Sequence, residues 1–90
     1  MEDNKYRKII NIGALNPEET KTFQSGLIFD NDNCILEKAE GYIEYSNFKL
    51  DLKNEKLKIH TDSGEITVTN SRDEKSVGGY IILNYKKYKK

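Results

Sequence analysis

Between residues 48 and 69, apolar side chains alternate with polar ones at a period of two, and this pattern constrains the fold more than any other feature of the chain. Leu50 and Leu52 alternate with charged residues, and Ile66 and Val68 alternate with threonines. Successive side chains of a β-strand point to opposite faces, so this period predicts strands with one buried face. Two short polar turns divide the segment into three runs, which predicts a three-stranded antiparallel meander.

Two further segments have strand character. Residues 5–12 alternate in the same way, and residues 80–83 form an apolar run that predicts a final strand from about residue 77 to about residue 85. This run is apolar enough to predict a strand covered on both faces. Gly78 and Gly79 stand at its start, where two glycines favour a bulge or a sharp bend.

One segment has the pattern of a helix start. Asn16 can cap a helix, Pro17 suits its first turn, and Glu19 is spaced to bond back to the cap residue. Ser25 and Gly26 follow soon afterwards. The pattern therefore predicts one short helix near residues 17–23.

The length and these elements together define the predicted fold. A chain of 90 residues is long enough for one domain and too short for two. We expect a mainly β protein with a minor α component: a small antiparallel sheet or barrel of about six to seven strands with the one short helix. Residues 1–85 form the predicted β-rich domain, and residues 86–90, which contain four lysines, form a predicted basic C-terminal tail.

The chain is poor in groups that perform catalysis or bind metals. It has one cysteine, Cys34, and one histidine, His60. Cys34 lies in an apolar triplet, where a free thiol packs in the core, and His60 lies on the polar alternation of its strand. One cysteine and one histidine cannot form a structural zinc site. We therefore expect no enzyme activity, no cofactor and no metal.

Residue usage predicts the cellular compartment and the type of genome that encodes the protein. No apolar run approaches the roughly 18 residues of a membrane span, and a single cysteine favours a reducing compartment. We expect the cytoplasm of a bacterium, or of the host cell if a phage encodes the chain, and no membrane association. Asn, Lys, Ile and Tyr are frequent, as in AT-rich genomes that include phages and mobile elements of low-GC bacteria.

Tyrosine is the remaining functional signal, because the chain has six tyrosines and no tryptophan. Tyrosine combines a large apolar ring with a polar tip and is enriched where proteins meet partners. Tyr85 and Tyr88 are the strongest surface candidates, because they alternate with lysines beyond the last apolar residues. The predicted partner-binding residues are Tyr42, Tyr45, Tyr80, Tyr85, Tyr88, Lys86 and Lys87.

These features predict a non-enzymatic protein-binding module, in the form of a phage or mobile-element inhibitor of a host defence protein that docks through an edge strand and its tyrosines. A small barrel similar to OB or SH3 domains, binding single-stranded nucleic acid, is the alternative. Residues 46–90 carry ten Lys/Arg against six Asp/Glu, which favours the alternative, but the formal net charge of the chain is +0, which disfavours it. A structural subunit of a larger assembly is a second alternative, and homo-oligomerisation is left open.

Overall fold

The computed structural model describes residues 4–30, 33–52 and 56–87. Its strands form two antiparallel sheets, and the predicted mainly β domain is confirmed. The strands are β1 (Asn4–Asn11), β2 (Thr20–Gln24), β3 (Cys34–Glu44), β4 (Lys49–Leu52), β5 (Leu57–His60), β6 (Glu65–Thr69) and β7 (Gly78–Lys87). Sheet A has the order β1-β7-β3-β4, and sheet B has the order β2-β6-β5.

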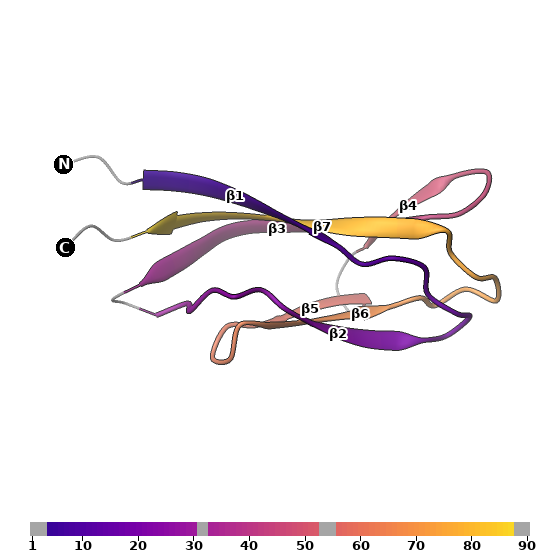
Figure 1. Cartoon of the computed structure of the whole chain (residues 1–90), viewed down its shortest axis with the longest axis horizontal. Helices are drawn as coiled ribbons and strands as arrows, with labels where there is room; N and C mark the ends of the chain where they lie inside the picture. The colour runs from indigo at the N-terminus through magenta and orange to yellow at the C-terminus, as the bar shows by residue number, and fades with distance from the viewer. Residues whose placement is uncertain (1–3, 31–32, 53–55, 88–90) are drawn as a thin grey trace.

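The two sheets lie one above the other, and the core lies between them (Figure 1). Side chains along β6 and β7 alternate between buried and half-buried positions, as the period of two requires. Ile43 and Ile81 of sheet A and Ile66 of sheet B are fully enclosed. Each such side chain contributes about 1.5–3 kcal/mol of hydrophobic stabilisation. The core therefore consists mainly of side chains from the inner faces of the two sheets, and the outer faces do not contribute to it.

The predicted meander is wrong in its pairing, although its three strands form. β4 pairs with β3, with Gly41 opposite Leu52, whereas β5 pairs with β6, with Ile59 opposite Ile66. The chain thus changes sheets between β4 and β5. Alternation along a strand specifies which side chains face the core. Because each of the two sheets turns one face toward the same core, a strand in either sheet shows the same alternation. The pattern consequently could not decide which strand is the neighbour of β4.

The predicted helix near residues 17–23 is wrong, and no α-helix occurs among the described residues. Only the contact expected of Glu19 forms: the Asn16 N–H donates to Glu19 Oε1 at 2.8 Å, whereas the Glu19 N–H donates to the main-chain carbonyl of Asn16 at 3.1 Å, which is the bond of a turn. They close a turn instead of starting a helix, because Glu18 between them has φ 59°. The chain then continues into β2, whose Phe23 packs against the core.

The last strand extends beyond the predicted end near residue 85, because β7 runs to Lys87. Lys86 and Lys87 belong to β7, where Lys87 lies opposite Asn4 on one side and opposite Cys34 on the other. Strands on both sides supply backbone partners up to this point, and this pairing does not depend on lysine side chains. Residues 88–90 of the predicted tail lie outside the described residues.

The sequence predicts a bulge or sharp bend at Gly78 and Gly79, but the bulge in the structure lies in another strand. The register shifts between Leu36 and Lys38 of β3. Gly79 instead permits close packing, because a Cβ there would lie 2.5 Å from the Tyr42 carbonyl oxygen and 2.8 Å from Ile12 Cδ1. A side chain at this position would displace backbone, so glycine is required by the approach of three strand segments rather than by a bend.

Candidate functional site

The face of sheet A that points away from sheet B carries a compact group of apolar and aromatic side chains. On this face Ile9 of β1 lies opposite Ile82 of β7, and Tyr80 of β7 lies opposite Tyr42 of β3. Directly opposite residues in a sheet share a face, so these four side chains are neighbours. We call Ile9, Tyr42, Lys49, Tyr80 and Ile82 the tyrosine face.

Tyr42, Tyr80 and Lys49 form one contact group. The two rings have centroids 5.1 Å apart at an interplanar angle of 40°. Lys49 Nζ lies 4.9 Å from the Tyr42 ring centroid and donates a hydrogen bond to the Tyr80 hydroxyl at 3.2 Å. This hydrogen bond raises the pKa of Lys49 above its ordinary value. The group therefore presents two tilted rings and a fixed cation at neutral pH.

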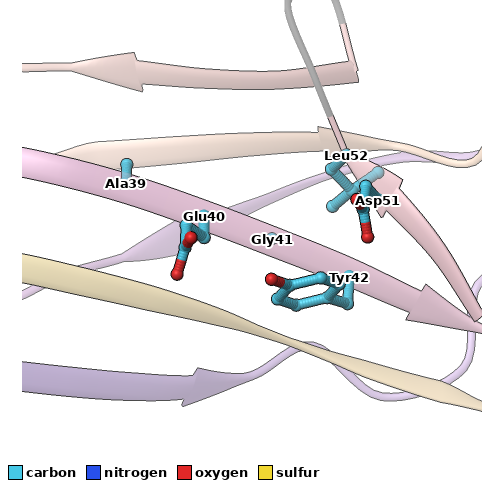
Figure 2. Close-up of a pocket in the computed structure, with 6 residues that line it drawn as sticks. All are labelled: Ala39, Glu40, Gly41, Tyr42, Asp51 and Leu52. Atoms are coloured by element: carbon cyan, nitrogen blue, oxygen red, sulfur yellow. The ribbon is translucent and has the colours of Figure 1, made fainter.

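Figure 2 shows the part of this face around β3. Glu40 and Tyr42 point to one side of the strand, and Ala39 points to the other. With Asp51 and Leu52 of β4, these residues line a pocket of about 160 Å³. Pockets that hold small molecules are larger, roughly 300–1,000 Å³. This hollow is thus smaller than a typical small-molecule pocket, which suits contact with another macromolecule more than enclosure of a small ligand.

The charges on the outer face of sheet A are nearly balanced. Lys38 pairs with Glu40 at 3.1 Å, and Lys86 pairs with Glu37 at 3.3 Å. Five cationic and four anionic side chains belong to this face and give it a net charge of +1: Lys5, Arg7, Lys38, Lys49 and Lys86 against Glu37, Glu40, Glu44 and Asp51. Surfaces that bind a phosphate backbone carry a clear cationic excess.

The structure brings together only part of the predicted partner-binding set. Tyr42, Tyr80 and Lys86 share the outer face of sheet A. Lys87 points to the inner side, where its Nζ lies 5.4 Å from the Tyr6 ring centroid. Tyr88 lies outside the described residues.

Tyr85 is buried, with 8% of its surface exposed, although the sequence predicts it, together with Tyr88, as one of the two strongest surface candidates. It has the same parity along β7 as Ile81 and Leu83, so it points toward sheet B. Its ring stacks on Tyr6 with centroids 5.6 Å apart. The neighbouring lysines suggested exposure, but the position along the strand decides the side to which Tyr85 points.

Tyr45 is also a core residue. Its hydroxyl donates to Asn70 Oδ1 at 2.6 Å, and the Asn70 side-chain amide donates in turn to the Glu74 carbonyl at 2.9 Å. Burial raises the pKa of the Tyr45 phenol, an effect that the nearby Arg72 guanidinium partly opposes. Tyr45 therefore fixes the polar loop after β6 to sheet A and is not available on the surface of the folded chain.

Sequence reasoning missed three members of the tyrosine face, namely Ile9, Lys49 and Ile82. The available signal was the apolar run at residues 80–83, which predicts a strand covered on both faces. The structure covers only one face, so the outward half of that run remains half-buried at the surface. No sequence pattern marks Lys49 as a site residue, because its contact with Tyr42 and Tyr80 depends on the pairing of β4 with β3.

The two groups with catalytic potential lie in different sheets. Cys34 is buried at the start of β3, and His60 is exposed at the end of β5, where its Nε2 lies 3.3 Å from Thr67 Oγ1. Among the described residues, no three histidine, cysteine or acidic side chains gather as a metal ion would require. The described segments also contain no helix that could cross a membrane.

No protein family model matches this chain, and no match was found among the curated proteins or the solved structures.

Proposed function

We propose that this protein is a non-enzymatic protein-binding module that docks through the tyrosine face. The supporting observation is the uncovered outer face of sheet A, where the half-buried Tyr80 and Ile82 adjoin Tyr42 and the 59% exposed Ile9. A solvated sheet face is ordinarily polar, and a grouped set of exposed apolar side chains marks an interaction site.

The kind of partner follows from the same face. Tyrosine and isoleucine bury large apolar areas, and Lys49 supplies one oriented cation at the edge of the group. The near balance of charges around the group is compatible with a protein surface and unfavourable for a polyanion. A protein partner therefore fits this face better than single-stranded DNA or RNA.

Residue usage supports a more specific proposal about the source and the biological role of the protein. The frequent Asn, Lys, Ile and Tyr residues favour a phage or mobile-element product that inhibits a host protein, with the bacterial cytoplasm as the compartment of both. The inhibitor acts in this proposal by covering a surface of its target rather than by chemistry.

The test is affinity capture from the lysate of a low-GC bacterium, with and without nuclease. The informative variant combines Tyr42→Thr and Tyr80→Thr, because threonine retains strand propensity while both rings are lost. Ile28→Ala is the matched control, since Ile28 is 60% exposed and lies outside the tyrosine face. We expect wild type and control to retain one stoichiometric protein after nuclease treatment and the double variant to retain at least about tenfold less.

Three outcomes would contradict the proposal. The partner could survive in the double variant at the wild-type level, although circular dichroism confirms that the fold is retained. Only nucleic acid could be captured, with steep salt dependence, which is the behaviour of a phosphate-binding surface. Sedimentation could instead show that the only assembly is a homo-oligomer of this chain.

A further inference from the structure

A second feature, independent of the tyrosine rings, is the open edge of sheet A at β1. β1 is the terminal strand of the sheet and pairs on one side only, with β7. It is eight residues long and therefore offers a continuous edge. A strand edge of this length is a template for pairing with another extended chain.

The hydrogen-bonding register identifies the backbone groups that point outward. The Ile12 N–H donates to the Gly79 carbonyl at 3.1 Å, so this pair bonds toward β7. Hydrogen-bonded and non-bonded pairs alternate along an antiparallel ladder. The backbone N–H and C=O groups of Lys5, Arg7 and Ile9 consequently point to the open edge, and no hydrogen bond from the described residues reaches them.

The charge along this edge has one sign. From residue 4 to residue 11 the sequence contains Lys5, Arg7 and Lys8 and no acidic residue. Lys8 is turned inward, where its Nζ donates to the Ser25 carbonyl, but Lys5 and Arg7 lie on the outer face. Arg7 Nε donates to Asn84 Oδ1 at 3.4 Å, and no carboxylate among the described residues forms an ion pair with any of the three cations.

We infer that the edge of β1 accepts an acidic extended segment of a partner protein as a fifth, antiparallel strand of sheet A. This inference rests on the proposed protein-binding function and adds the class of segment that is bound. Residues opposite each other share a face, so the partner places carboxylates opposite Lys5 and Arg7 and an apolar side chain opposite Ile9. The added strand also extends the tyrosine face, since Ile9 belongs to both.

A second copy of this chain is the less favourable occupant of the edge. Two β1 strands paired across a two-fold axis would bring four outward cationic side chains, Lys5 and Arg7 of each copy, and no carboxylate from residues 4–11 to one junction. Like charges that face each other across strands are destabilising. Sheet completion by self-pairing is therefore opposed by the same lysines and arginine that attract an acidic strand.

The test uses capped eight-residue peptides and amide hydrogen exchange of the intact chain followed by NMR. The probe peptide alternates glutamate with N-methylvaline, and an unmethylated valine replaces the one glutamate that would lie opposite Ile9, so only the edge bearing the glutamate N–H groups can pair. One control peptide carries the N-methyl groups on the glutamate amides instead. The other control replaces glutamate with lysine and keeps the methylation pattern of the probe.

We expect the probe peptide alone to slow exchange at Lys5, Arg7 and Ile9. In a chain carrying both Lys5→Glu and Arg7→Glu, the probe should bind about tenfold more weakly and the lysine peptide should bind more tightly than to wild type. This reciprocal exchange of preference requires direct charge pairing and a retained fold.

Several results would overturn the inference. They are the absence of protection by the probe at millimolar concentration, equal protection by either control peptide, and protection of the three amides by self-association of the free chain. Binding of oligo(dT) at these cations without slowed exchange would also overturn it, since it would assign the edge charges to a phosphate backbone. None of these results depends on Tyr42 or Tyr80, so the proposed function can stand or fail separately through its own capture experiment.

Discussion

On β7, Ile81, Leu83 and Tyr85 face sheet B, whereas Tyr80 and Ile82 face away from it. The first three are at most 8% exposed, and the last two are half-buried on an open surface. The two faces of this strand are thus similar in apolar character, but only the inner face is covered by the other sheet. The second sheet covers the inner face and leaves the outer face open.

The hydroxyl groups of the tyrosines show the same difference. Tyr45, on the core side, donates to Asn70 and is held within a network of buried hydrogen bonds. Tyr80, on the outer side, accepts a hydrogen bond from the exposed Lys49. A tyrosine in this protein is consequently enclosed in the core or left at the surface according to the face on which it lies.

The sharpest test of the two-face comparison is truncation of neighbouring side chains on opposite faces. Leu83→Ala should lower the free energy of unfolding by about 2–5 kcal/mol, because a fully buried side chain leaves a cavity between the sheets. Ile82→Ala should lower the free energy of unfolding by about 1 kcal/mol or less, because Ile82 lies on the outer face and its truncation leaves no buried cavity. Urea denaturation monitored by circular dichroism gives both values. Equal losses would mean that the outer face is covered in the free protein.

The adjacent glycines at the start of β7 allow the same comparison with an added methyl group. Gly79→Ala should destabilise the fold by about 1–3 kcal/mol, because the new Cβ would meet the Tyr42 carbonyl oxygen at 2.5 Å. Gly78→Ala should be neutral or should stabilise the fold by up to about 1 kcal/mol, because the nearest atom, Glu44 Oε1, is 4.0 Å away. Thermal unfolding of the two variants would distinguish them, and similar melting temperatures would contradict the close packing at Gly79.

The smallest of the three effects concerns the two tyrosine hydroxyls. Tyr45→Phe should cost about 1 kcal/mol, since Asn70 Oδ1 loses a buried donor, whereas Tyr80→Phe should cost about 0.5 kcal/mol or less. Chemical denaturation at neutral pH measures both. A larger loss in the Tyr80 variant would reverse the assignment of core and surface.

The Tyr45 variant should also change the response to alkaline pH. Because burial raises the pKa of Tyr45 above its ordinary value of 10.0, the folded state holds this proton more tightly than the unfolded chain. The associated stability is complete below that ordinary pKa and is lost as the pH rises through the raised pKa of the folded state. The Tyr45→Phe chain should show a smaller decrease in stability over this range, and a decrease identical to that of wild type would exclude the contribution of Tyr45.

Much of the secondary structure could be predicted because it depends on local pattern. The alternation at Leu50, Leu52, Ile66 and Val68 predicts strands, and strands form at all four positions. The prediction for residues 17–23 failed although Glu19 bonds back to Asn16 as expected, because that contact fits a turn with φ 59° at Glu18 as well as a helix. Local side-chain bonding specifies a reversal of the chain but not the element that follows it.

The candidate site could be predicted only in part, because a site depends on which strands become neighbours. Tyr42 and Tyr80 were named from composition, but their contact exists because β3 pairs with β7, and Lys49 joins them because β4 pairs with β3 instead of β5. The same pairings direct Tyr45 and Tyr85 into the core.

By itself, the sequence determined a single small strand-rich domain, the parity of side chains along each strand, and the shortage of catalytic groups. Only the tertiary structure decided the division of the described strands into two sheets, the face of sheet A that sheet B covers, and the exposure of the edge at β1. The physical reason is that parity is a property of one strand, whereas cover and edges arise from contacts between strands that are distant in the chain.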